Sequence, residues 1–81
     1  MHLHLAVHTG IDPKITERFL LAQPSVVDAD VWYVRGRLHA KVAVVDQGPT
    51  DVDLREECAR ALGANQAPAN ITLVSVRLRA A

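Results

Sequence analysis

The sequence lacks most of the patterns that mark secreted, membrane-bound or redox-active proteins. It contains one cysteine, Cys58, which excludes an internal disulfide and fits a reducing compartment best. No apolar run approaches the length of about 20 residues that a membrane-spanning helix needs. From Met1 onward there is no basic region followed by an apolar stretch, as a signal peptide would have. We therefore expect a cytoplasmic protein with no membrane partner.

An excess of charge of one sign is also missing. Nine lysines and arginines balance nine aspartates and glutamates, whereas nucleic-acid-binding domains usually carry a large basic excess. The chain has no glycine-rich phosphate-binding loop either. We expect neither a nucleic-acid partner nor a cofactor.

What the chain does contain is enough apolar sequence for one thin core. Its 81 residues are 49% hydrophobic and 22% charged, which is ordinary for a globular protein. A chain of this length forms one domain, and such small domains are often stabilised by a metal, a disulfide or a partner. We expect a single domain over residues 1–81.

The first third of the chain predicts a strand followed by a helix. Residues 2–8 alternate between apolar and polar side chains, which is typical of a half-buried strand. A helix should begin at Asp12 and Pro13, because aspartate is a good N-cap and proline is tolerated at the first helical position. Pro24 should end it, since the residue before a proline is pushed out of the helical region.

The middle of the chain predicts a β-hairpin. Residues 26–34 and 38–45 both read as strands, and the glycine of Arg35-Gly36 suits a tight turn between them. In the first of these strands, one face should hold Val27, Ala29, Val31 and Tyr33.

The last third predicts a second helix and a final strand. Thr50 is the expected cap, with an acidic residue three places on, and Gly63 is the expected C-terminal stop. Residues 71–78 form the last strand, with Thr72, Val74, Val76 and Leu78 on one face.

The resulting order is β-α-β-β-α-β, which predicts an α+β fold. Two helices cannot cover both faces of a four-stranded sheet. We therefore expect a ferredoxin-like sandwich, with a four-stranded antiparallel sheet and two helices on one face. Its other face would be exposed or covered by a partner.

Several short motifs appear in the order found in a known enzyme family. They are Ile11-Asp12-Pro13 with Glu17 and Leu20 (I-x-P-x-x-x-E-x-x-L), the strand entry from Gln23 to Val31, the turn and strand from Gly36 to Val42, the helix and its exit from Leu54 to Pro68, and the strand start from Ile71 to Val74. This series resembles the C-terminal lid subdomain of the adenylate-forming enzymes, which include acyl-CoA synthetases, nonribosomal peptide adenylation domains and luciferases.

The chain departs from that family at the position that carries its chemistry. The family has P-x-T-x-x-G-K after the last strand, and its lysine contacts the carboxylate and phosphate of the reaction. In this sequence no lysine follows Lys41, and none precedes Lys14. The resemblance therefore implies a free-standing lid scaffold without the catalytic lysine, and adenylation by this chain alone is not expected.

The uncovered sheet face holds the most unusual side chains of the sequence. In the ferredoxin-like order the first and third strands are neighbours, which would bring the histidines of the first strand beside His39 and Lys41. The expected binding face consists of His2, His4, His8, Asp28, Asp30, Trp32, His39 and Lys41.

Three functions compete for this face. The leading hypothesis is a non-catalytic accessory module that binds a second copy, an adenylation domain or a carrier protein in a biosynthetic pathway. The first alternative is a small dimeric α/β-barrel-type enzyme of the cyclase or isomerase kind, with His4, His39 and Asp30 as acid–base candidates. The second is a metal-binding regulatory domain with His2 and His4 as candidate ligands.

Overall fold

The computed structural model describes residues 11–45 and 48–77, and it forms an α+β fold over this part of the chain. Along the sequence the elements are α2 (Pro13–Leu21), β1 (Val26–Val34), β2 (Arg37–Val45), α3 (Asp51–Leu62), the short 3-10 helix η1 (Ala64–Gln66) and β3 (Asn70–Val76). The strand predicted over residues 2–8 lies outside the described residues. No helix in the described ranges is long and apolar enough to cross a membrane.

Helix α2 begins and ends where the sequence predicts. The Asp12 carboxylate accepts a hydrogen bond from the backbone N–H of Lys14 at 3.0 Å, and Pro13 occupies the first turn. Proline suits that position because its missing N–H would have no partner inside the helix. The helix closes at Ala22, two residues before Pro24.

Strands β1 and β2 form the predicted hairpin. Arg35 and Gly36 connect them, and both have positive φ, 52° and 81°. A two-residue turn with this geometry matches the right-handed twist of the strands it joins. Near the other end, a bulge between Val26 and Asp28 sets Val26 opposite Val44 and leaves Val27 48% exposed. The prediction that Val27 shares the regular alternation of β1 was therefore wrong.

Helix α3 carries both predicted end signals. The Thr50 hydroxyl accepts from the Asp53 N–H at 3.1 Å, and the Asp53 carboxylate accepts from the Thr50 N–H at 3.3 Å. This reciprocal capping box satisfies two backbone donors that the helix cannot bond internally. At the far end, Gly63 adopts a φ of 100°, which ends the helix.

The sheet differs from the predicted one. In the described residues it has three strands in the order β1-β2-β3, with β1 antiparallel and β3 parallel to β2. The expectation of a four-stranded antiparallel, ferredoxin-like sheet is therefore wrong. The chain crosses over through α3 after β2 and returns to pair directly with it. A strand that follows such a crossover runs parallel to the strand before it.

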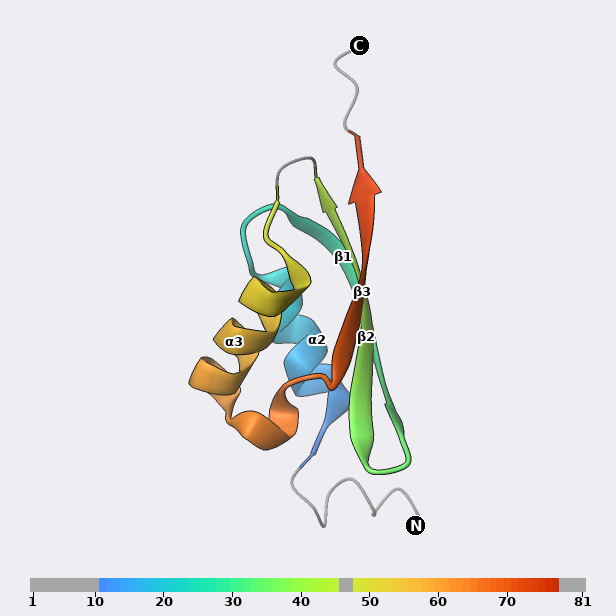
Figure 1. Ribbon diagram of the computed structural model, residues 1–81, viewed down its shortest axis with the longest axis vertical. Helices are drawn as coiled ribbons and strands as arrows, with labels where there is room; N and C mark the ends of the chain where they lie inside the picture. Colours follow the sequence, from blue (N-terminus) through green and yellow to red (C-terminus); the bar gives the residue numbers. More distant parts are fainter. Residues whose placement is uncertain (1–10, 46–47, 78–81) are drawn as a thin grey trace.

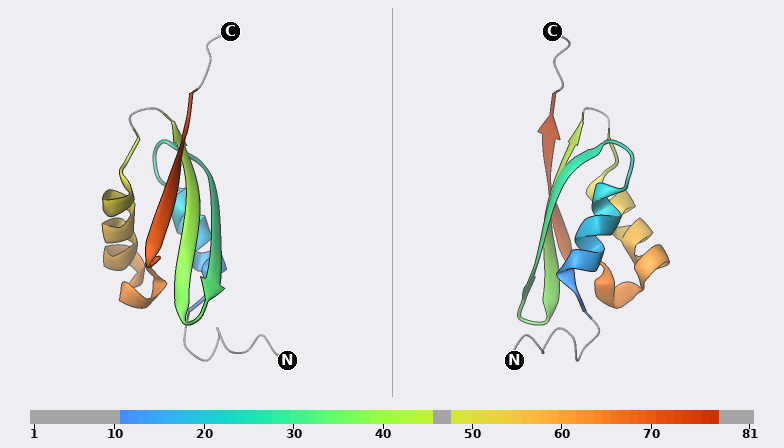
Figure 2. Two further views of the ribbon diagram at one scale, coloured as in Figure 1. Left: turned by 45° about the vertical axis from the view of Figure 1, so that its right-hand side comes forward. Right: turned by 180° about the vertical axis from the view of Figure 1, so that it is seen from behind.

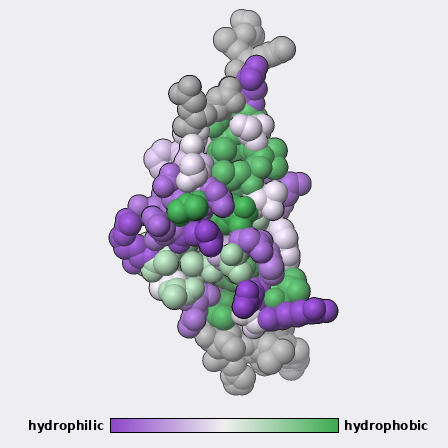
Figure 3. Space-filling view, in the orientation of Figure 1, coloured by the Kyte–Doolittle hydropathy of each residue, from purple (hydrophilic) through white to green (hydrophobic). Residues whose placement is uncertain are grey.

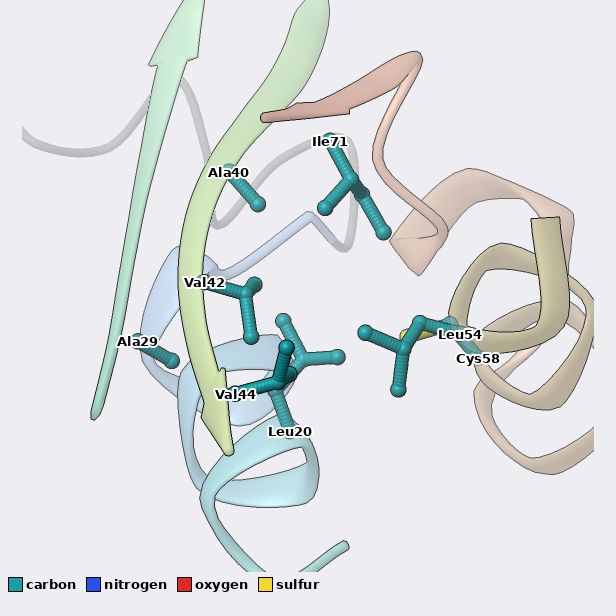
Figure 4. Packing of buried hydrophobic residues seen from close by; sticks show 8 residues of the cluster. All are labelled: Leu20, Ala29, Ala40, Val42, Val44, Leu54, Cys58 and Ile71. Carbon is teal, nitrogen blue, oxygen red and sulfur yellow. The ribbon is translucent and has the colours of Figure 1, made fainter. Parts of the chain in front are cut away.

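Both helices lie on one face of this sheet (Figure 1), and the views from other directions show the opposite face uncovered (Figure 2). Between the layers lies a cluster of buried side chains, in which Val42 and Val44 of β2 point toward Leu20 of α2 and Leu54 of α3 (Figure 4). These side chains are at most 5% exposed. Burying one such side chain stabilises the fold by roughly 1.5–3 kcal/mol.

Candidate functional site

The uncovered face of the sheet, called here the open sheet face, is a grid of three rows and three strands. The strand register sets each row at one level: the first is Trp32, His39 and Asn70, the second is Asp30, Lys41 and Thr72, and the third is Asp28, Ala43 and Val74. Alternation along each strand keeps these nine side chains on the face away from the helices. The face therefore presents an aromatic row, a charged row and a smaller mixed row.

The first row is held together by an aromatic contact and a hydrogen bond. The rings of Trp32 and His39 stack, with centroids 6.2 Å apart and planes 19° apart. His39 Nδ1 lies 3.2 Å from Asn70 Oδ1, which is within hydrogen-bond distance. Trp32 nevertheless remains 44% exposed. The row is thus an ordered platform that still presents an indole ring to its surroundings.

The second and third rows carry the charge. Asp30 lies opposite Lys41 in the register, yet no ion pair joins the two side chains in the described part of the chain. The Asp28 carboxylate accepts a hydrogen bond from the Ala29 N–H at 2.9 Å. All members of these two rows except Thr72 line a hollow of about 140 Å³. Acidic side chains thus follow β1, and cationic or neutral ones follow β2.

Apolar side chains continue onto the edge of the sheet. Val74 is 38% exposed, and hydrophobic atoms gather over the upper part of β3 (Figure 3). An exposed apolar side chain thus adjoins the charged rows at the β3 edge of the sheet.

The structure brings together five of the eight residues predicted for the binding face: Asp28, Asp30, Trp32, His39 and Lys41. The other three, His2, His4 and His8, lie outside the described residues. The position beside β2 that the prediction gave to the histidine-bearing strand is taken by β3, so Asn70 and Thr72 are the neighbours of His39 and Lys41.

Of the catalytic candidates, His39 has a different environment from the one that the sequence predicted. His39 is bonded to Asn70 and stacked on Trp32, and no hydrogen bond joins it to Asp30 in the described ranges. Across residues 11–45 and 48–77, no group of three histidine, cysteine or carboxylate side chains is arranged to hold a metal ion. The third acid–base candidate, His4, and the metal candidates His2 and His4 remain predictions, since they lie outside the described residues.

Sequence reasoning missed a buried polar network on the helix side. The Gln66 side chain accepts from the Asp12 N–H at 2.8 Å and donates to the Asp12 carbonyl at 3.0 Å and to the Thr16 hydroxyl at 2.9 Å. The Thr16 hydroxyl in turn donates to the Gln66 carbonyl at 2.7 Å. This network ties η1 to the start of α2, and it fixes the connection that leads into β3.

A larger hollow, of about 550 Å³, lies on the helix side between α3, η1 and the start of β2. Arg37 and Arg55 contribute to its wall together with Glu56 and Pro68. The buried Nε of Arg55 has no hydrogen-bond partner among the described residues. The lining of this hollow carries charges of both signs and does not define a ligand class.

Cys58, the single cysteine of the sequence, is fully buried in the core. Its side chain is 0% exposed, and desolvation, followed by the charge of Glu57, raises the pKa of the thiol to about 11. A thiol with such a pKa stays protonated near neutral pH and is inert. Cys58 is therefore a core side chain and not a reactive thiol.

Comparison with known proteins adds evidence from structure alone. No protein-family model and no curated protein sequence matches the chain. Among solved structures, an ATP-bound RpMatB-BxBclM chimera superposes on 79% of this chain with a TM-score of 0.71 and 21% identity. The amide bond synthetase of Marinactinospora thermotolerans matches 76% of this chain with a TM-score of 0.68 and 26% identity. The unliganded O-succinylbenzoate coenzyme A synthetase of Bacillus subtilis matches 88% of this chain with a TM-score of 0.67 and 26% identity.

In each case the match involves a small part of a much longer enzyme. The chain spans 14% of the chimera, 14% of the amide bond synthetase and 15% of the coenzyme A synthetase. The resemblance read from the motifs between Ile11 and Val74, to the C-terminal subdomain of the adenylate-forming enzymes, is confirmed by these structural neighbours.

Proposed function

We propose that this chain is a lid-like accessory domain that works by associating with another protein through the open sheet face. The observation that carries the proposal is the exposed Trp32, which stacks on His39 near the hairpin end of a face that no part of the described chain covers. In this proposal the face binds the surface of another protein and not a small substrate.

The chemistry of the face supports a protein partner. Tryptophan is among the residues that contribute most to protein interfaces, and such anchors act best when neighbouring contacts exclude water. Here charged side chains of both signs, Asp28, Asp30 and Lys41, lie in the two rows next to the aromatic row. The hollow among them, about 140 Å³, is too small and shallow for a typical ligand pocket of about 300–1,000 Å³.

The structural neighbours support the accessory role. In those enzymes this fold is 14–15% of a much longer chain, so a domain of this kind exists there beside a far larger one. The two partners to test are therefore a second copy of this chain and the remaining part of an adenylate-forming enzyme. The pathway would be biosynthetic, as for a coenzyme A synthetase or an amide bond synthetase.

The experiment uses Trp32 as its reporter, because it is the only tryptophan in the chain. Its emission is followed while the protein is concentrated alone, and while it is titrated with the Bacillus subtilis synthetase from which the matching C-terminal segment has been deleted. Sedimentation velocity measures the mass in both series. Association by the open sheet face shifts the Trp32 emission to the blue as the mass increases.

Two outcomes contradict the proposal. One is a monomer whose Trp32 emission stays that of a water-exposed indole in both titrations. The other is release of pyrophosphate when the purified chain is given ATP, Mg²⁺ and carboxylic acids, since a domain that adenylates by itself is not an accessory module. A variant with Val52→Ser, on the exposed side of α3, is the matched control and should associate as the wild type does.

A further inference from the structure

We propose that the partner on the open sheet face is a second copy of this chain, docked face to face around a two-fold axis that runs parallel to β1 and β2 and midway between them. The inference rests on the proposed function and names its partner. The inference is based on charge complementarity: when a second copy is rotated about this axis, its charged side chains lie over side chains of opposite charge in the first copy.

The strand register makes the match. Asp30 is the cross-strand partner of Lys41, and Trp32 is the cross-strand partner of His39. Rotation by half a turn about an axis between these strands exchanges β1 with β2 and keeps every residue at its own level. Asp30 then lies over the partner's Lys41, and Trp32 lies over the partner's His39. Each contact occurs twice, as in any isologous interface.

Another two-fold arrangement of the same faces is unfavourable. An axis in the plane of the interface but perpendicular to the strands would place β1 over β1 and β2 over β2. The acidic Asp28 and Asp30 would then face the same carboxylates of the other copy. Like charges brought together in an interface are strongly disfavoured, so the charge pattern selects the axis along the strands.

The side chains involved are free to make these contacts. Within one copy, Asp30 and Lys41 form no ion pair in the described part of the chain, so neither has to give up a partner on docking. Trp32 is 44% exposed and lies one row away, where the second copy would cover it. The second face thus supplies the charge partner for Asp30 and Lys41 and covers the exposed indole ring of Trp32.

The test uses charge reversal in the full chain. Asp30→Lys places lysine over the partner's Lys41 twice, and Lys41→Asp places two carboxylates together twice. Each variant alone should raise the dimer dissociation constant on the order of 10- to 100-fold, measured by sedimentation equilibrium. An equimolar mixture of the two variants pairs unlike charges at both positions, so it should return to a dimer of near wild-type affinity. Circular dichroism confirms that each variant is folded.

The matched control is Glu56→Lys, which reverses a charge on the exposed surface of α3 and should leave the dissociation constant unchanged. A mixture that stays monomeric while both variants are folded overturns the proposed axis. A wild-type protein that is monomeric but shows the Trp32 shift with the truncated synthetase overturns the second-copy inference and leaves the proposed function standing. A monomer with neither response overturns both.

Discussion

At the scale of single residues, Cys58 shows how the core controls chemistry. The thiol has an ordinary pKa of 9.0 in the unfolded chain and about 11 in the folded protein. Between these values the unfolded chain loses the thiol proton while the folded protein keeps it, so the unfolded state binds fewer protons. The free energy of unfolding should therefore fall as pH rises from 9 to 11, by roughly 2–3 kcal/mol from this residue.

Urea unfolding at a series of pH values measures this effect. Cys58→Ala removes the titrating group, so the variant should be less stable than the wild type at pH 8 and should lose less stability between pH 9 and 11. Equal pH dependence in the two proteins would show that the thiol titrates freely in the folded state. The sign is opposite to that of a carboxylate with a lowered pKa, whose contribution is lost on acidification.

Gln66 marks the limit of what residue patterns reveal. Its burial could not be predicted, because glutamine is usually exposed and its partners, Asp12 and Thr16, lie 54 and 50 positions away. No local signal in the sequence identifies such a contact. Cys58, in contrast, was predictable because it falls on the apolar stripe of a helix whose two ends are both marked.

At the scale of elements, the β1–β2 turn is a place where the sequence is not optimal for its structure. Arg35 has a φ of 52°, a left-handed conformation that asparagine tolerates far better than arginine. Arg35→Asn should therefore stabilise the protein by about 0.5–1 kcal/mol in chemical unfolding. Gly36→Ala, at a φ of 81°, should destabilise it by about 1–2 kcal/mol. If both substitutions proved neutral, the turn would not have the conformation described.

The elements also show why the strands were predictable and their arrangement was not. Alternation, caps and turn residues are local, and they predicted α2, β1, β2 and α3 closely. For the second side of β2 the sequence offers two neighbours, the strand predicted at residues 2–8 and the strand β3. The crossover through α3 and the packing of Ile71 into the core place β3 beside β2. Neither effect can be predicted from the sequence of one strand alone. The same error placed the histidine-bearing strand next to His39.

At the scale of the whole molecule, the thin core and the open sheet face have the same cause: both helices pack on one side of the sheet. A domain of this size buries a smaller share of its surface than a larger one, and here both helices are on one side of the sheet. The uncovered side therefore carries exposed side chains, Trp32 among them, that a partner could still bury. A second copy would complete a four-layer arrangement with helices outside and the two sheets inside.

This arrangement predicts how association depends on salt. The proposed two-fold axis creates two Asp30–Lys41 contacts between copies, and exposed ion pairs of this kind contribute up to about 1 kcal/mol each. Because added salt screens them, the dimer dissociation constant should rise with ionic strength, by about 30-fold at most for the two contacts together. Asp30→Asn should weaken the dimer at low salt and flatten its salt dependence.

Trp32→Ala should weaken the dimer at every salt concentration, because burial of an indole ring is not screened. A wild-type dissociation constant that stays constant or falls as salt is added would mean that the two faces meet through apolar contacts alone, and the register of charges would then have no part in the choice of partner.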